Sequence, residues 1–178
     1  AESWVLDEGI VKDGSYHISH GVGARSVVGD KTGFSYSDDL SLKAIQGAID
    51  FAKGISDTKR LYQPKILQQS SSRAKYPALS PLGSLTPKEK VDVLRQIDVI
   101  ARKEKAVKQV SASLSGAYSE ILIASTDGVY QMDCRPMVRI SVSVVVEKNG
   151  RVEQASSGGG GRYDYRYFVD NGFIETYT

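Results

Sequence analysis

Short stretches of β-prone residues alternate with turn-forming steps over the first 37 residues. The steps Asp13-Gly14 and Gly29-Asp30 contain residues that tolerate the positive φ angles of tight hairpins. The pattern therefore predicts a meander of short antiparallel strands in this region. The expected strands cover residues 3–6, 10–12, 16–18 and 22–28.

After residue 40 the apolar residues recur at spacings of three and four, which is typical of one face of an α-helix. Ser41 stands where an N-cap residue is favoured, and Gly54 stands where a glycine commonly follows a helix. The pattern predicts a helix that begins after Ser41 and ends before Gly54. Its apolar face comprises Leu42, Ala44, Ile45, Ala48, Ile49 and Ala52.

A second helix is predicted from its first residues, because Thr86, Pro87 and Glu89 form a capping-box sequence. The threonine side chain can accept a hydrogen bond from the glutamate amide, and the glutamate side chain can accept one from the threonine amide. Proline at the first helical position already has a helical φ angle. Apolar residues at helical spacing from Val91 onward predict that the helix runs to about residue 105.

Beyond the second helix, apolar residues occupy every second position, which predicts strands with one polar face. The expected strands are residues 110–115, 120–125 and 138–146. The Thr126-Asp127-Gly128 segment predicts a turn, and Lys148-Asn149-Gly150 is typical of a type I′ hairpin. Residues 151–157 are therefore expected to return antiparallel to the strand before them.

These elements predict an α+β fold of antiparallel β-sheets with two principal α-helices, arranged in two segments. Residues 1–60 form the N-terminal β-meander and helix, and residues 86–178 form the second helix followed by an antiparallel sheet. The stretch 61–85 has no periodicity and contains three prolines and a triple serine, so an irregular connection is expected there. The last segment is expected to be truncated at its C-terminal end.

The composition is that of an ordinary globular protein, with 40% apolar and 25% charged residues among 178. The 23 basic and 21 acidic residues are interspersed, whereas a dedicated nucleic-acid binder concentrates its basic residues in a patch. No apolar run approaches the roughly 20 residues that span a bilayer, and no basic and apolar leader opens the chain. The single cysteine excludes an internal disulfide. A cytoplasmic protein that binds neither membrane nor nucleic acid is therefore expected.

Two histidines and one cysteine are the obvious candidates for metal binding or nucleophilic chemistry. His17 and His20 are three residues apart, a spacing that places them on opposite faces of a strand. Ordinary surface or partly buried histidines are therefore expected rather than zinc ligands. Cys134 lies more than a hundred positions from either histidine and is expected to be a small buried apolar residue. No catalytic or metal-binding residue is predicted in this chain.

A run of glycines near the C-terminal end is the candidate contact site. It consists of Gly158, Gly159, Gly160, Gly161 and the following Arg162. Backbone N–H groups exposed by glycine can hold an anion or a passing peptide backbone. The run matches neither glycine-rich phosphate motif, and the alternatives are a flexible loop or a close approach of two backbones. Tyr163, Tyr165 and Tyr167 would share one strand face if the next segment is extended, which favours a core or interface face.

Seven ordered stretches of the sequence carry a family resemblance. They are residues 2–16, 21–25, 31–36, 113–116, 124–128, 135–139 and 157–162, the last reading Ser-Gly-Gly-Gly-Gly-Arg. These stretches are similar to the TldD branch of the TldD/PmbA family, also called the modulator of DNA gyrase family. They span nearly the whole chain and none is a generic motif, so the resemblance is specific.

The resemblance implies a bacterial zinc metalloprotease that acts on peptides or unfolded proteins, with this chain as its N-terminal, non-catalytic portion. The family's zinc lies on an H-E-x-x-x-H helix in the later part of the full-length chain, where the glutamate activates the metal-bound water. No His-Glu pair occurs in this sequence, so no catalytic or metal residue is carried over. The chain alone is expected to be inactive and to bind no zinc.

The resemblance also implies a partner and a mode of substrate binding. The expected partner is the paralogous PmbA subunit, also called TldE, with self-association as the other arrangement. A chamber that admits unfolded peptide is implied, and strand addition to an exposed sheet edge would hold such a peptide.

A standalone protein-binding module that modulates a partner such as DNA gyrase is the alternative from a different functional class. An in-frame H-E-x-x-x-H motif downstream of Thr178 would support the protease, whereas a stop codon would support the module. Nucleic-acid binding would show affinity that falls steeply with salt, and the near-neutral charge argues against it.

Overall fold

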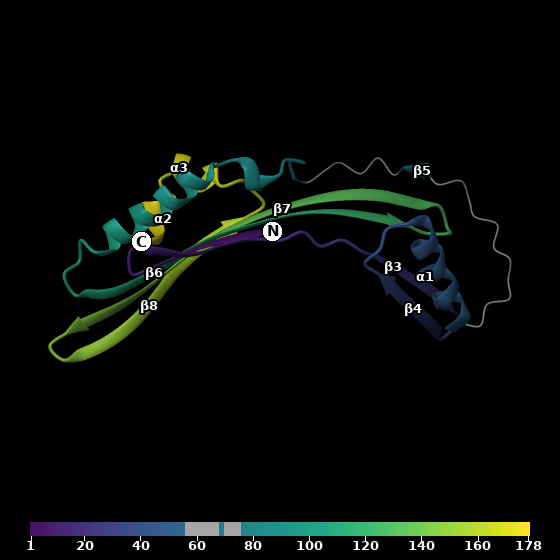
Figure 1. The fold of residues 1–178 in the computed structure, drawn as a ribbon, viewed down its shortest axis with the longest axis horizontal. Helices are drawn as coiled ribbons and strands as arrows, with labels where there is room; N and C mark the ends of the chain where they lie inside the picture. The colour runs from purple at the N-terminus through teal and green to yellow at the C-terminus, as the bar shows by residue number, and fades with distance from the viewer. Residues whose placement is uncertain (56–67, 70–75) are drawn as a thin grey trace. The chain divides into compact units, whose positions relative to one another are not determined.

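The computed structural model describes residues 1–55, 68–69 and 76–178 (Figure 1). The chain divides into two compact units, one formed by Ala1–His17 with Leu67–Thr178 and the other by Ile18–Ile66. The expected irregular connection at 61–85 lies outside the described residues, apart from 68–69 and 76–85. The fold is α+β with antiparallel sheets, as the sequence predicts.

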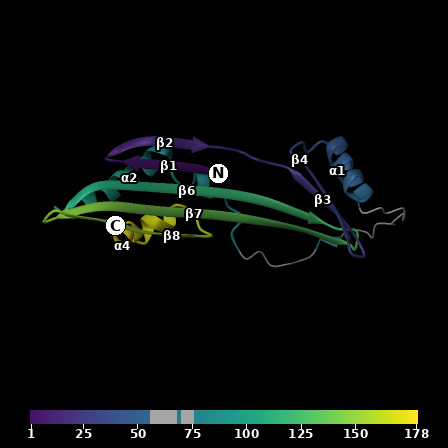
Figure 2. The same ribbon diagram turned by 90° about the horizontal axis from the view of Figure 1, so that it is seen from below.

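The larger unit is built on a six-stranded sheet in the order β2-β1-β6-β7-β5, with β8 also paired to β7. Its strands are β1 (Glu2–Asp7), β2 (Ile10–Tyr16), β5 (Gln68–Gln69), β6 (Val107–Ala124), β7 (Val129–Lys148) and β8 (Arg151–Gly161). Neighbouring strands are antiparallel except for the short β5–β7 pair. Figure 2 shows β2, β1, β6, β7 and β8 side by side.

Tight turns join β7 to β8 and β1 to β2, whereas the turn expected at Asp13-Gly14 is absent because both residues lie within β2. Asn149 and Gly150 have φ angles of 54° and 77°, so the expected type I′ hairpin between β7 and β8 is present. Glu8 and Gly9 adopt the same left-handed conformation between β1 and β2, with φ angles of 53° and 75°. Both turns match the right-handed twist of the strands that they connect.

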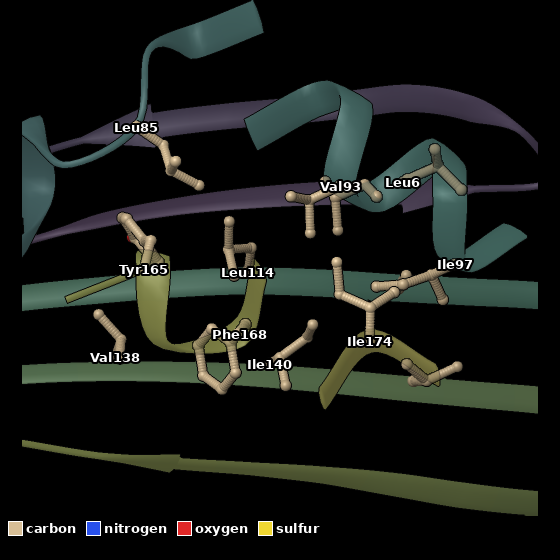
Figure 3. Packing of buried hydrophobic residues seen from close by; sticks show 13 residues of the cluster. Leu6, Leu85, Val93, Ile97, Leu114, Val138, Ile140, Tyr165, Phe168 and Ile174 are labelled. Carbon is tan, nitrogen blue, oxygen red and sulfur yellow. The ribbon is translucent and has the colours of Figure 1, made fainter. Parts of the chain in front are cut away.

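One face of this sheet is covered by helices, and the core lies between the two layers (Figure 1). The helices are η1 (Pro81–Gly83), α2 (Pro87–Ala101), α3 (Arg166–Asp170) and α4 (Phe173–Tyr177). Figure 3 shows side chains from the sheet meeting those from the helices, including Leu6, Val93, Ile97, Leu114, Val138, Ile140, Phe168 and Ile174. Burying each aliphatic or aromatic side chain contributes about 1.5–3 kcal/mol, so this layer is what holds the helices on the sheet.

The capping box at the start of α2 is confirmed. The Thr86 side chain accepts a hydrogen bond from the Glu89 amide at 3.3 Å, and Glu89 accepts one from the Thr86 amide at 2.6 Å. These bonds hold the pKa of Glu89 below its usual value. The helix ends at Ala101, four residues before the predicted end, because residues 102–105 turn toward β6.

A buried ion pair joins α2 to the first strand. The ammonium of Lys90 donates to the Glu2 carboxylate at 2.6 Å and to the Leu82 carbonyl at 2.7 Å, and the lysine side chain is only 3% exposed. The rings of Trp4 and Tyr165 lie 5.7 and 5.2 Å from the same nitrogen. This cluster connects β1, η1, α2 and the segment before α3 at one point.

The smaller unit contains the hairpin of β3 (Val22–Val28) and β4 (Lys31–Ser37) with the helix α1 (Leu42–Ile55). Ser41 caps α1, since its hydroxyl accepts a hydrogen bond from the Ala44 amide at 3.2 Å. Gly33 faces α1, and any Cβ there would overlap the Ala52 carbonyl oxygen. The predicted stop at Gly54 is wrong, because α1 continues to Ile55 with open space around that glycine.

Two further predictions are corrected by the sheet topology. The first four strands form two hairpins in different sheets rather than one meander, because β1 pairs with β6 and places Leu6 in the main core. Residues 120–125 are not a separate strand, since residues 120–124 continue β6 without a break and pair with β7. Cross-strand pairing decides both outcomes, and no local pattern reports it.

Candidate functional site

The glycine run lies at the end of β8 rather than in a loop. Gly158, Gly159, Gly160 and Gly161 pair with Ser141, Ile140, Arg139 and Val138 of β7. Among the described strands β8 has no neighbour on its other side, and most of its residues are exposed. The last residues of the sheet's edge strand are therefore bare main chain.

Each glycine of the run fits a place where a side chain could not. A Cβ at Gly159 would overlap the hydroxyl of Tyr177, and one at Gly161 would lie 2.5 Å from the ring of Tyr163. A Cβ at Gly160 would overlap the Val138 carbonyl oxygen of the neighbouring strand. The close approach of two backbones, one of the alternatives drawn from the sequence, is thus present alongside the open edge.

An aromatic row covers the helix-facing side of these glycines. The ring centroids of Tyr163 and Tyr167 are 4.1 Å apart, those of Tyr167 and Phe173 4.7 Å, and those of Phe173 and Tyr177 5.8 Å. Burial of the Tyr167 hydroxyl is the main cause that raises its pKa. These rings fill space that glycine side chains would otherwise need, so the end of β8 is packed on one face.

The three tyrosines do not share a strand face, because their segment is not extended, although the expected core position holds for Tyr165. Residues 163–167 turn into α3, and the Asp164 carboxylate accepts a hydrogen bond from the Arg166 amide at 2.9 Å at that turn. Tyr163 and Tyr167 therefore stack, while Tyr165 is fully buried in the core. Its hydroxyl has no hydrogen-bond partner in the described part of the chain, and burial together with the nearby Glu2 carboxylate raises its pKa.

Arg162 is held by the chain itself. Its guanidinium donates to the Pro136 carbonyl at 3.3 Å and lies 5.4 Å from the centroid of the Tyr76 ring. The side chain is half-buried. The positive charge at this position therefore secures the turn after β8 to β7.

Arg139 is the charged residue beside the run that sequence reasoning missed. It is exposed and pairs across the sheet with Gly160 on one side and Ser115 on the other. Its alternation with Val138 and Ile140 places it on the polar face of β7, but only the register of β8 brings it next to the glycines. The rest of that face is rich in serine, with Ser143 hydrogen-bonded to Gln154 and Ser156.

The structure places the two histidines on the surface. Both His17 and His20 are exposed, and the His17 amide donates to the Ala1 carbonyl at 3.0 Å. Within the described ranges, no three histidine, cysteine, aspartate or glutamate residues lie together as a metal site would need.

Cys134 lies on the part of β7 that extends past the core. It is half-buried rather than fully buried as expected, and it stands opposite Glu120 of β6. Its hydrogen bond with Tyr118, aided by burial of the phenol, raises the pKa of that tyrosine to about 12.

None of the helices within the described residues has the length and apolar character needed to cross a bilayer.

Comparisons with protein families match both segments of the chain. The model of the PmbA/TldA metallopeptidase domain 1 matches residues 1–56, and that of the PmbA/TldA metallopeptidase central domain matches residues 80–176. The "Metalloprotease TldD homolog" of Haemophilus influenzae is 46% identical over 172 residues, which are 95% of this chain and 36% of that protein. The protein of the same name from Buchnera aphidicola subsp. Schizaphis graminum is 46% identical over 169 residues, 94% of this chain and 35% of its own length. The chain therefore spans about a third of the curated relatives that it matches.

Solved structures share the fold at low sequence identity. A Thermotoga maritima protein, named as a candidate modulator of a DNA gyrase, matches 99% of this chain and 40% of its own with a TM-score of 0.77 and 15% identity. TldE from Thermococcus kodakarensis matches the same shares with a TM-score of 0.73 and 15% identity. At this identity the likeness concerns the fold alone.

Proposed function

Because the chain belongs to the PmbA/TldD metallopeptidase family, we propose that it is the N-terminal, non-catalytic portion of a zinc metallopeptidase of peptides or unfolded proteins. The observation that carries the proposal is the 46% identity to relatives named as metalloproteases, over about a third of their length. The peptidase activity belongs to the intact protein, in the cytoplasm.

The proposed zinc is held by residues outside this chain, on an H-E-x-x-x-H helix. Bound zinc would supply an activated water and polarise the scissile carbonyl. The residues in hand do not fit such a centre, since the two histidines are exposed and the sequence has no His-Glu pair. No step of the reaction is therefore assigned to residues 1–178.

The proposed role of this chain is to hold substrate at the edge of its sheet. The main-chain groups on the outer side of β8 have no strand partner among the described residues, and such an edge is a template for another strand. The contact residues are Gly158, Gly159, Gly160 and Gly161, with Arg162 securing the end of the strand. Main-chain hydrogen bonds hold a peptide without reading its side chains, which suits unfolded substrates.

The proposed assembly pairs this protein with the paralogous PmbA/TldE subunit, or with a second copy of itself. The likeness of the fold to TldE from Thermococcus kodakarensis supports a paralogue built on the same sheet.

The test compares residues 1–178 with the full-length protein that contains them. The full-length protein should hold about one zinc per chain by elemental analysis and cleave an unfolded polypeptide such as casein. Residues 1–178 alone should do neither. Stoichiometric zinc with cleavage by the short chain would refute the assignment, and a stop codon directly after Thr178 in the gene would favour the standalone binding module instead.

A further inference from the structure

The guanidinium of Arg139 is an unneutralised charge in a neutral part of the sheet. Its two cross-strand neighbours are Ser115 and Gly160, and the next residues on its face of β7 are Met137 and Ser141. In the described part of the chain it makes no ion pair. A cation without a counter-charge on an exposed sheet face is available to a ligand.

Gly160 opens a path from Arg139 to the outer edge of β8. Neighbouring strands lie about 4.8 Å apart, so a strand added outside β8 would run about 10 Å from β7. A Cβ at position 160 would overlap the Val138 carbonyl oxygen of β7, so no side chain can occupy this position. Gly160 has none, and the long arginine side chain can extend over it.

The chemistry that Arg139 would recognise is a carboxylate. A guanidinium binds a carboxylate with two parallel hydrogen bonds, and its charge cannot be removed at physiological pH. Arg162 does not offer the same interaction, because its guanidinium is already bound to the Pro136 carbonyl and lies by the Tyr76 ring.

We propose that the open edge of β8 prefers extended peptides with a carboxylate in register with Gly160, recognised by Arg139. This inference rests on the proposed peptide binding at β8 and adds a side-chain preference to it. The carboxylate is an Asp or Glu side chain or the C-terminus of the peptide.

The experiment uses the full chain and four fluorescein-labelled nine-residue peptides of alternating threonine and valine. Three are amidated and carry Glu, Gln or Lys at the central position, and the fourth carries Gln and a free C-terminal carboxylate. Dissociation constants are measured by fluorescence anisotropy at 20 mM and 500 mM NaCl. The Glu peptide should bind about two- to fivefold more tightly than the Gln peptide at low salt, the range that one exposed ion pair supplies. The difference should vanish at high salt.

The variant Arg139→Gln should remove the preference and leave the affinity for the Gln peptide unchanged. Arg95→Gln, at an exposed arginine of α2, is the matched control and should behave as the wild type. Tighter binding of the peptide with the free C-terminus, lost in Arg139→Gln, would assign the carboxylate to the substrate terminus. Hydrogen exchange should show protection of residues 151–161 when peptide is bound.

Equal affinities for the Glu and Gln peptides, with protection of β8, would overturn the role of Arg139 and leave strand addition standing. A preference for the Glu peptide that persists in the Arg139→Gln variant would likewise overturn the role of Arg139 and leave strand addition standing. Binding without protection of β8, or no binding of any peptide, would overturn both this inference and the proposed contact site.

Discussion

Replacing Lys90 with methionine tests the buried ion pair that joins α2 to β1. The lysine and glutamate side chains are 3% and 8% exposed, and their charged atoms are 2.6 Å apart. Methionine keeps most of the aliphatic stem beside Trp4 but leaves the Glu2 carboxylate buried without its counter-charge. It also leaves the Leu82 carbonyl without the ammonium donor.

The expected loss follows from the burial of both partners. Removing one member of a buried ion pair costs about 3–5 kcal/mol, because the other charge remains without solvent or a partner. In a chain of this size, each kcal/mol lowers the melting temperature by about 2–4 °C, so a fall of about 6–20 °C is expected. The double variant Lys90→Met with Glu2→Gln removes both charges and should recover a large part of the loss.

Urea unfolding, monitored by the fluorescence of Trp4, the single tryptophan, measures the change in the free energy of unfolding. Trp4 lies beside the ion pair, so its signal reports on the perturbed region. Lys88→Met, at an exposed position of the same helix, should change the free energy of unfolding by less than about 0.5 kcal/mol. A loss below about 1 kcal/mol for Lys90→Met, or an equal loss for Lys88→Met, would refute the reasoning.

Gly159→Ala should destabilise the larger unit by about 1–3 kcal/mol because its methyl group overlaps Tyr177, and adding Tyr177→Phe should restore part of the loss in the same urea assay. Gly47→Ala, where a Cβ meets nothing within 4 Å, is the control and should be neutral or stabilising. Thr86→Ala should cost about 1 kcal/mol by removing the cap of α2. Since the folded-state pKa of Glu89 is lowered from 4.5, its contribution to stability is present above that pH and is lost as the pH falls through the folded-state pKa. Urea melts at pH 3 and pH 6 should therefore differ less for Glu89→Gln than for the wild type, and an unchanged difference would contradict this role of the Glu89 carboxylate.

Local features of the fold could be predicted because their causes lie within a few residues. The cap at Thr86 needs only Glu89 three positions later, and the turn at Asn149-Gly150 needs only its own backbone angles. The two-residue period of 138–146 likewise follows from one face of β7 being buried. Errors arose where a local preference was overridden, as at Gly54, where the helix continues past a residue that often ends one.

The sequence predicted which residues form the candidate site, but it did not predict which strands and side chains surround them. The sequence alone identified the glycine run, and the open edge, the aromatic row over it and the position of Arg139 all depend on pairing with β7. Arg162 was included in the candidate site only because it follows the glycines directly. Its contact with the Pro136 carbonyl, 26 positions away, could not be inferred from its neighbours in the chain.

The sequence by itself determined the class of fold, the start of α2, the tight turn between β7 and β8 and the family. These depend on short-range geometry or on a pattern of residues that can be compared directly. Only the tertiary structure decided that β1 joins β6, that Lys90 meets Glu2 across 88 positions, and that Arg139 lies beside Gly160. The physical reason is that strand register and helix docking minimise the free energy of the whole core, and a local stretch of sequence contains only part of that energy.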